Sequence, residues 1–102
     1  MLLEIAEIEV RPGTEEAFSA AMREVGLEQL SACEGVVSIR FGRGVENPSK
    51  FTFNVVWTSM EAHDSARKLD SFGRFRAAFG DLGVGGTMSH YVMDEAIPGR
   101  AA

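Results

Sequence analysis

The chain has 102 residues, of which 45% are hydrophobic and 25% are charged, and its formal net charge is -5 at pH 7. This acidic balance argues against nucleic acid and anionic membrane surfaces as partners, because both select basic patches. With no signal-peptide pattern, no apolar run of about 20 residues and only one cysteine, Cys33, the sequence predicts a cytoplasmic protein without a disulfide.

Residues 2–11 form the first predicted element, a strand whose side chains alternate between two faces. The two sets are Leu2, Ala6, Ile8 and Val10 on one face, and Leu3, Ile5, Glu7 and Glu9 on the other. Pro12-Gly13 ends the strand, and Thr14 is placed to cap the next helix. That helix is indicated by the helical spacing of Phe18, Met22 and Val25, and Gly26 weakens it.

Two strands are predicted next, joined by a turn over residues 46–49. The first covers residues 36–45, with Val37, Ile39 and Phe41 expected on one face. The second begins at Lys50 and has period-two aromatic and β-branched residues, which suit a half-buried pleated surface: Phe51, Phe53, Val55 and Trp57. The two strands are therefore expected to form a hairpin.

At Thr58 the period changes from strand to helix. Thr58 and Ser59 are good N-cap residues, and Glu61 stands three positions after Thr58, as in a capping box. The helix should bury a stripe of Ala62, Ala66 and Leu69, and Asp70-Ser71 is a candidate break. A second apolar stripe follows, made of Phe72, Phe75 and Phe79. The glycines at 80, 83, 85 and 86 predict a flexible loop, and residues 87–96 predict the last strand.

The resulting order is β-α-β-β-α-β, which is the α+β ferredoxin-like arrangement of a four-stranded antiparallel sheet with helices on one face. We expect one domain over residues 1–102, with a core over about 2–96 and a tail over 97–102. The helix-free face carries Leu3, Ile5 and Val56 and is too apolar to stay in water. A second copy of the sheet is the simplest cover, so the sequence predicts a homodimer.

Four stretches together resemble antibiotic biosynthesis monooxygenase domains: Arg11 to Phe18, Glu34-Gly35, Val56 to His63, and Ser71 to Phe75. The resemblance covers about residues 2–96. It implies a dimeric α+β barrel, and a family that includes cofactor-independent oxygenases of polyketide aromatics and quinols, haem-degrading enzymes and small-molecule isomerases.

The sequence departs from two branches of that family. At the positions that would serve haem degradation, by register, stand Ala6, Ala66 and Phe79, and none supplies an axial ligand, so we expect no haem. The polyketide oxygenases tend to have an asparagine four residues before the tryptophan of the third strand. Phe53 occupies that position, and Asn54 beside it should point to the opposite face.

Trp57, His63 and Arg67 are the candidate catalytic residues, at the corner between the third strand and its helix. Trp57 is either a stacking wall for an aromatic ligand or a residue of the core alone. His63 is either a base or a surface histidine. Arg67 lies one turn further along, so as a neighbouring cation it would favour a neutral imidazole and could stabilise an anion.

The substrate site is expected to use four further residues: Phe53, Asn54, Phe75 and His90. His90 and Asn54 also have simpler explanations, at a subunit interface or facing a partner sheet, and Arg74 and Arg76 fit a solvated helix face. Two histidines and one cysteine, widely separated, match no metal-ligand spacing, so no metal is expected.

These features predict a cofactor-independent monooxygenase that acts on a small aromatic, quinol or enolisable compound, in a pocket between sheet and helices. A dry pocket, a base and fixed orientation would suffice for such a substrate. Two alternatives stay open: a non-catalytic dimeric protein with a binding or structural role, and a small-molecule isomerase. A cavity beside Trp57 and His63 would favour the first hypothesis over a structural role.

Overall fold

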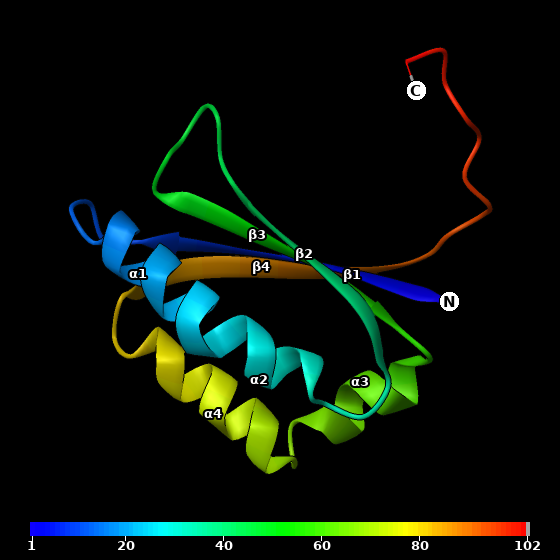
Figure 1. The fold of residues 1–102 in the computed structure, drawn as a ribbon, viewed down its shortest axis with the longest axis horizontal. Helices are drawn as coiled ribbons and strands as arrows, with labels where there is room; N and C mark the ends of the chain where they lie inside the picture. Colours follow the sequence, from blue (N-terminus) through cyan, green and yellow to red (C-terminus); the bar gives the residue numbers. More distant parts are fainter. Residues whose placement is uncertain (102) are drawn as a thin grey trace.

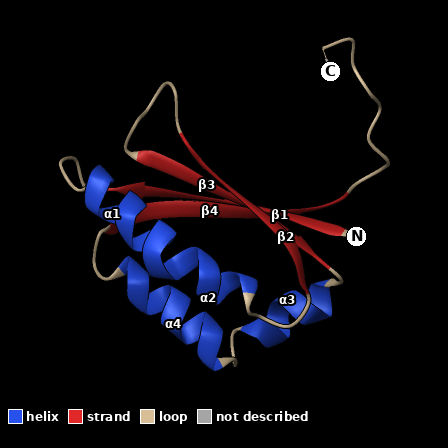
Figure 2. Ribbon diagram, in the orientation of Figure 1, coloured by secondary structure: helices blue, strands red, loops and turns tan. Residues whose placement is uncertain are grey.

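The computed structural model describes residues 1–101, which form one antiparallel sheet with helices on one of its faces (Figures 1 and 2). The elements in chain order are β1 (Leu2–Val10), α1 (Glu15–Ala21), the π-helical stretch η1 (Met22–Gly26), α2 (Leu27–Ser31), β2 (Val36–Arg43), β3 (Lys50–Trp57), α3 (Met60–Ala66), α4 (Asp70–Phe79) and β4 (Gly83–Val92). The strand order is β2-β3-β1-β4, and every neighbouring pair is antiparallel. The predicted β-α-β-β-α-β order and one-sided helix layer are confirmed.

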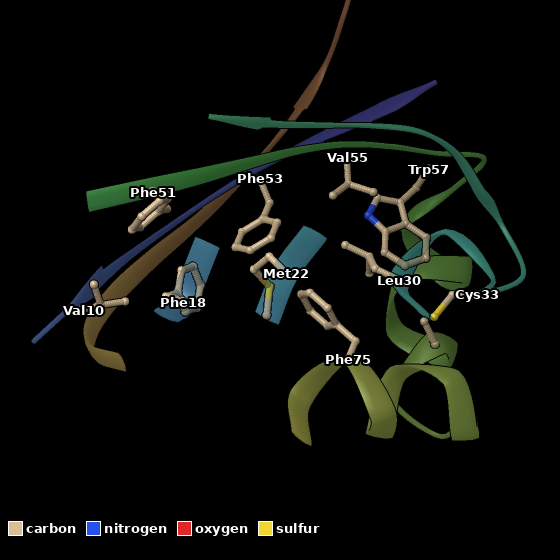
Figure 3. Close-up of a cluster of buried hydrophobic side chains, with 11 residues drawn as sticks. Val10, Phe18, Met22, Leu30, Cys33, Phe51, Phe53, Val55, Trp57 and Phe75 are labelled. Atoms are coloured by element: carbon tan, nitrogen blue, oxygen red, sulfur yellow. The ribbon is translucent and has the colours of Figure 1, made fainter. Parts of the chain in front are cut away.

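Strand β3 supplies the centre of the core, and its period-two pattern is confirmed. Phe51, Phe53, Val55 and Trp57 are all buried, whereas the residues between them are not. Their side chains point at the helix layer, where they pack among Phe18, Met22, Leu30 and Phe75 (Figure 3). Because these rings are large and contiguous, they hold α1, η1, α2 and α4 against the sheet mainly by removing apolar surface from water.

The first helix is interrupted, as Gly26 suggested, but it bends into a π-helical stretch, η1, rather than ending there. A side chain on Gly26 would come within 2.7 Å of the end of the buried Met22 side chain, so glycine gives that methionine its space. Thr14 was expected to cap α1. It occupies the N-cap position, but its side chain makes no capping hydrogen bond, because its hydroxyl donates to the backbone oxygen of Arg11 instead.

Helix α3 begins at the predicted corner, with Ser59 as its N-cap. The Ser59 hydroxyl oxygen accepts the backbone N–H of Ala62 at 3.1 Å, so the capping box proposed from Thr58 and Glu61 is wrong by one residue. The helix does break near the predicted point, but the break lies at residues 67–69, because α3 ends at Ala66 and Asp70 and Ser71 already belong to the first turn of α4. The break lets α4 turn and cover the middle of the sheet.

Three strands differ from their predicted bounds: β1 ends at Val10 rather than residue 11, β2 ends at Arg43 rather than residue 45, and β4 ends at Val92 rather than residue 96. β4 starts at Gly83 rather than Thr87, because pairing with β1 outweighs the low strand propensity of glycine. At Gly86 a side chain would come within 2.6 Å of the Glu7 backbone oxygen, so glycine permits this close approach. In β2 a bulge between Val36 and Ser38 places Val36, not Val37, against the core.

The helix-free face of the sheet is bare in the single chain. Leu3, Ile5 and Val56 lie on it with Thr52 and Asn54, and all five are half-buried. The segment after β4 leaves the body on this helix-free side, and its Ile97 is 91% exposed (Figure 1). Among the described residues, no helix is long and apolar enough to cross a membrane.

Glu15 ties the start of α1 to the β2–β3 turn. One of its carboxylate oxygens accepts the Ser49 hydroxyl at 2.6 Å, and the other accepts the Gly13 backbone N–H at 2.8 Å. The Ser49 hydrogen bond is the largest cause of a lowered pKa for the Glu15 carboxyl. A carboxyl with a lowered folded-state pKa adds stability above its ordinary pKa of about 4.3 and loses it as the pH falls through the lowered value.

We therefore expect Glu15→Gln to lower the unfolding free energy at pH 7 and to matter less as the pH falls below about 4.3. Urea titrations of the variant and the unmodified chain across this range would measure the difference. Glu24→Gln is the control, since among the described residues its carboxylate makes no hydrogen bond or ion pair. A Glu15→Gln deficit that stayed constant with pH would contradict the charge-assisted contacts.

Candidate active site

A cavity of about 520 Å³ lies between the sheet and helix α4, and residues of the edge strand β4 contribute to its lining. Its floor is made by β1 and β3, and its roof by aromatic side chains of α4 with the end of α3. The principal apolar residues around it are Ala6, Ile8, Phe53, Trp57, Phe72, Phe75 and Phe79. One end of the cavity is polar, where Glu4 and His63 contribute to the lining.

Glu4 is a buried carboxylate on the core face of β1, only 6% exposed. Its Oε1 accepts a hydrogen bond from the indole Nε1–H of Trp57 at 2.8 Å. Trp57 is opposite Leu2 in the β1–β3 pairing, so its indole reaches along the core face to Glu4. The bond satisfies the one donor of a fully buried tryptophan and holds the carboxylate in place.

His63 lies above this pair on the second turn of α3 and is also only 6% exposed. Its Nε2 is 3.7 Å from the same Glu4 oxygen, and its Nδ1 is 3.1 Å from the Asp64 carboxylate. The imidazole meets the Trp57 indole edge to face, with ring centroids 5.3 Å apart. The ring is therefore held between two carboxylates and an aromatic wall.

His90 completes the cluster from β4. The β1–β4 register places it directly opposite Glu4, so its side chain lies on the same core face. Its Nε2 is 3.3 Å from the Nε2 of His63, which is hydrogen-bonding distance when one nitrogen carries the proton and the other accepts it. His90 is only partly buried, so it connects the buried cluster to the outside.

We name Glu4, Trp57, His63 and His90 the acid–base cluster. With two imidazoles and a carboxylate at the end of an apolar cavity, it has the groups that accept, hold and return protons. Among the described residues, no buried polar side-chain atom lacks a hydrogen-bond partner, so the cluster is satisfied without a ligand.

The structure brings most predicted site residues together. Trp57, His63, Phe53 and Phe75 line the cavity. The surface alternative for His63 is wrong, and Trp57 is both a core residue and a cavity wall. His90 points inward and contacts His63 rather than standing apart.

Two predicted residues are placed differently. Arg67 lines the cavity but is exposed, and the groups in contact with His63 are carboxylates rather than this cation. Asn54 lies on the helix-free face, where its side-chain oxygen accepts the Thr52 hydroxyl, so it does not reach the cavity of its own chain. Arg76, expected on a solvated helix face, reaches the cavity lining.

Glu4 was missed by the sequence reasoning, although one signal was present. It occupies the same period-two face as Leu2, Ala6, Ile8 and Val10, where a charged residue is out of place unless it has a partner. The sequence spacing of histidine and cysteine also gave no sign of a group of possible metal ligands that the fold assembles. Glu4, His63 and His90 are far apart in sequence, but they offer ligand atoms that all lie within 4.8 Å of one another.

A family model described as antibiotic biosynthesis monooxygenase matches residues 1–78 of the chain. No curated protein matches it significantly in sequence. Among solved structures, a candidate antibiotic biosynthesis monooxygenase from Bordetella bronchiseptica is 24% identical, with a TM-score of 0.81 over 92% of this chain and 97% of that one.

SnoaB, a cofactor-independent oxygenase from Streptomyces nogalater, is 15% identical with a TM-score of 0.76, over 96% of this chain and 97% of that one. A candidate from Nitrosomonas europaea is 15% identical with a TM-score of 0.75, over 91% of this chain and 98% of that one. At these identities the similarity establishes the fold, and it confirms the ferredoxin-like α+β prediction.

The Trp57–Glu4 hydrogen bond should contribute to the free energy of unfolding. Glu4→Ala leaves a buried indole N–H without an acceptor, so we expect it to lower the unfolding free energy by about 1–3 kcal/mol. Glu4→Gln keeps an oxygen in place and should cost less. Urea denaturation followed by circular dichroism would measure both, and equal losses in the two variants would show that the hydrogen bond contributes little.

Proposed function

The chain belongs to the antibiotic biosynthesis monooxygenase family, and we propose that it is a cofactor-independent monooxygenase of a small aromatic, quinol or enolisable compound. The observation that carries the proposal is the acid–base cluster at the end of an apolar cavity. The cavity volume of about 520 Å³ is in the range that holds a small organic ligand. The aromatic side chains around it suit a flat, apolar substrate.

His63 is the base in this proposal. The Asp64 carboxylate accepts a hydrogen bond from Nδ1–H of His63, which leaves the Nε2 lone pair directed at the other members of the cluster. A phenol or an acidic C–H at the polar end of the cavity gives its proton to the cluster, and His90 passes it toward the exposed edge of β4. Trp57 fixes the position of Glu4, and Glu4 stabilises the imidazolium that forms.

The substrate then reacts with dioxygen without help from a cofactor. Its carbanion or phenolate gives one electron to O₂, and the resulting radical pair combines into a hydroperoxide. Loss of water from the hydroperoxide leaves one oxygen atom on the product as a carbonyl. For a methylene substrate the balance is R₂CH₂ + O₂ → R₂C=O + H₂O, and the protein supplies the base, the orientation and the dry site.

Arg67 and Arg76 support the same chemistry from the cavity mouth. Both line the cavity, so their guanidinium groups are cations that can reach an anion formed there. Because both side chains are exposed, we assign them the capture and partial stabilisation of the substrate anion rather than the proton transfer. SnoaB, one of the structurally similar proteins, is named a cofactor-independent oxygenase, which agrees with the proposed reaction class.

A second candidate function is supported by the contact between the two imidazoles. Nitrogen atoms 3.3 Å apart can remove a proton from one carbon of a substrate and return it to another, which is the requirement for an isomerase. The two reactions differ in their need for dioxygen. The cavity beside Trp57 and His63 favours either reaction over a purely structural role.

We also propose that the protein is a homodimer that packs its helix-free sheet faces together. Leu3, Ile5 and Val56 would then be covered, and the polar Thr52 and Asn54 would fix the relative position of the two sheets. The segment after β4 supports this arrangement, because it extends on the side where the second copy would lie (Figure 1). Its exposed Ile97 would gain a partner there.

The oxygenase proposal is tested with chelator-treated, untagged protein and a panel of hydroquinones and anthrones. We expect oxygen consumption without added flavin or metal, and one ¹⁸O atom in the product from ¹⁸O₂. His63→Gln should lower kcat/KM by about 100-fold or more, because general-base catalysis contributes that much.

Glu61→Gln, an exposed change on the same helix, is the control and should leave the rate unchanged. A rate that survives His63→Gln would remove His63 from the mechanism. Turnover of the substrate without oxygen uptake would favour the isomerase.

The dimer proposal is tested by sedimentation equilibrium at micromolar concentration, where the mass should be twice the 11.1 kDa of one chain. Ile5→Asp places a charge on the proposed interface and should split or unfold the dimer. Val25→Asp changes a residue of the helix layer that is 46% exposed, and should leave the dimer intact. A molecular mass equal to that of one chain for the unmodified protein would contradict the dimer proposal.

A further inference from the structure

We propose that Glu4, His63 and His90 form a binding site for one divalent first-row transition-metal ion. This goes beyond the function proposed above, in which the same side chains act without a metal. Three different elements, β1, α3 and β4, each contribute one ligand atom, and these atoms lie within 4.8 Å of one another. Glu4 and His63 are buried and His90 is half-buried, so each of them has limited freedom to move away.

The spacing of the ligand atoms suits such an ion. Tetrahedral zinc, with bonds of about 2.0–2.2 Å to nitrogen and oxygen, places its ligand atoms about 3.3–3.6 Å apart. The two Nε2 atoms are 3.3 Å apart, and the His63 Nε2 is 3.7 Å from the Glu4 oxygen. Small side-chain adjustments would therefore bring all three ligands to bonding distance.

The groups behind the ligands are those that metal sites use. Asp64 is hydrogen-bonded to Nδ1 of His63, which directs the lone pair of Nε2 at the centre of the cluster. Trp57 donates to the Glu4 carboxylate and fixes its orientation. Metal-binding histidines and carboxylates are usually held by such outer partners, and here both are present before any ion binds.

The donor set selects the class of ion. Two imidazoles and one carboxylate suit zinc, iron, cobalt or nickel, whereas calcium and magnesium prefer sites made of oxygen alone. Three protein ligands leave at least one coordination position for water or substrate. Because the cavity adjoins the cluster, that position would be accessible from the cavity.

Metal binding and proton transfer would exclude each other at this site. A bound ion occupies the Nε2 lone pair of His63, which is the lone pair that accepts the substrate proton in the proposed reaction. The metal-bound protein would therefore lack its base, and zinc would inhibit the cofactor-independent oxygenase.

Binding is measured on the untagged full chain after chelator treatment, so that Glu4, His63 and His90 are not competing with tag histidines. Zinc titration calorimetry should give one ion per chain. Co²⁺ should quench the emission of Trp57, the only tryptophan, because its indole lies 5.3 Å from the His63 ring. Quenching that saturates at one equivalent would place the ion at the cluster.

Two variants remove a ligand without removing the fold. His90→Ala changes a half-buried residue of the edge strand, and Glu4→Gln keeps an acceptor for Trp57. Each should weaken zinc binding by at least the roughly 10- to 100-fold that loss of an outer partner costs. Glu24→Gln, on the exposed side of η1, should have no effect.

The absence of saturable binding, or tight binding that persists in His90→Ala or Glu4→Gln, would overturn the site. The titrations need no substrate, so they separate this proposal from the oxygenase. If the chelator-treated protein consumes oxygen but binds no zinc, only the metal-site proposal is contradicted. If zinc binds but no substrate reacts, the metal site stands and the oxygenase does not.

Discussion

A single buried carboxylate constrains much of this structure. Glu4 is placed in the core by the alternation of β1, where a charged group is costly unless donors surround it. The indole of Trp57 meets that need from β3 by donating a hydrogen bond, and the imidazole of His63 lies 3.7 Å from the same carboxylate oxygen, from α3. The requirement therefore links the central strand, its neighbour and the helix that follows, and it places polar groups at the end of a cavity that is otherwise apolar.

The elements that could be predicted from the sequence are those whose signal is local. Buried and less buried side chains alternate without exception from Phe51 to Trp57, and a capping serine marks the change to helix. This strand and the corner after it could therefore be predicted. The strand at residues 83–86 could not be predicted, because its glycines have low strand propensity and only pairing with the neighbouring strand β1 makes them part of the sheet. The bulge in β2 could not be predicted either, since one extra residue does not change the composition of the strand noticeably.

The site was harder to predict than the fold because it depends on register. His63 and Trp57 were found because they share one strand-to-helix corner. Glu4 and His90 become neighbours only when β1 and β4 pair in one particular alignment, and nothing in the order of residues fixes that alignment. The position of Asn54, by contrast, follows from local sequence alone. The alternation of β3 that buries Phe53 turns Asn54 to the helix-free face, away from the cavity.

The π-helical stretch η1 makes the helix layer unusually sensitive to chain length. Each residue of an α-helix advances the direction of its side chain by about 100°. Deleting one residue from η1 would return the segment to regular α-helix and rotate every later side chain of that helix. Leu30 would then turn away from Trp57 and the cavity. A change of length at Met22–Gly26, rather than a change of residue type, is thus a route by which related chains could reshape the cavity while they keep the sheet.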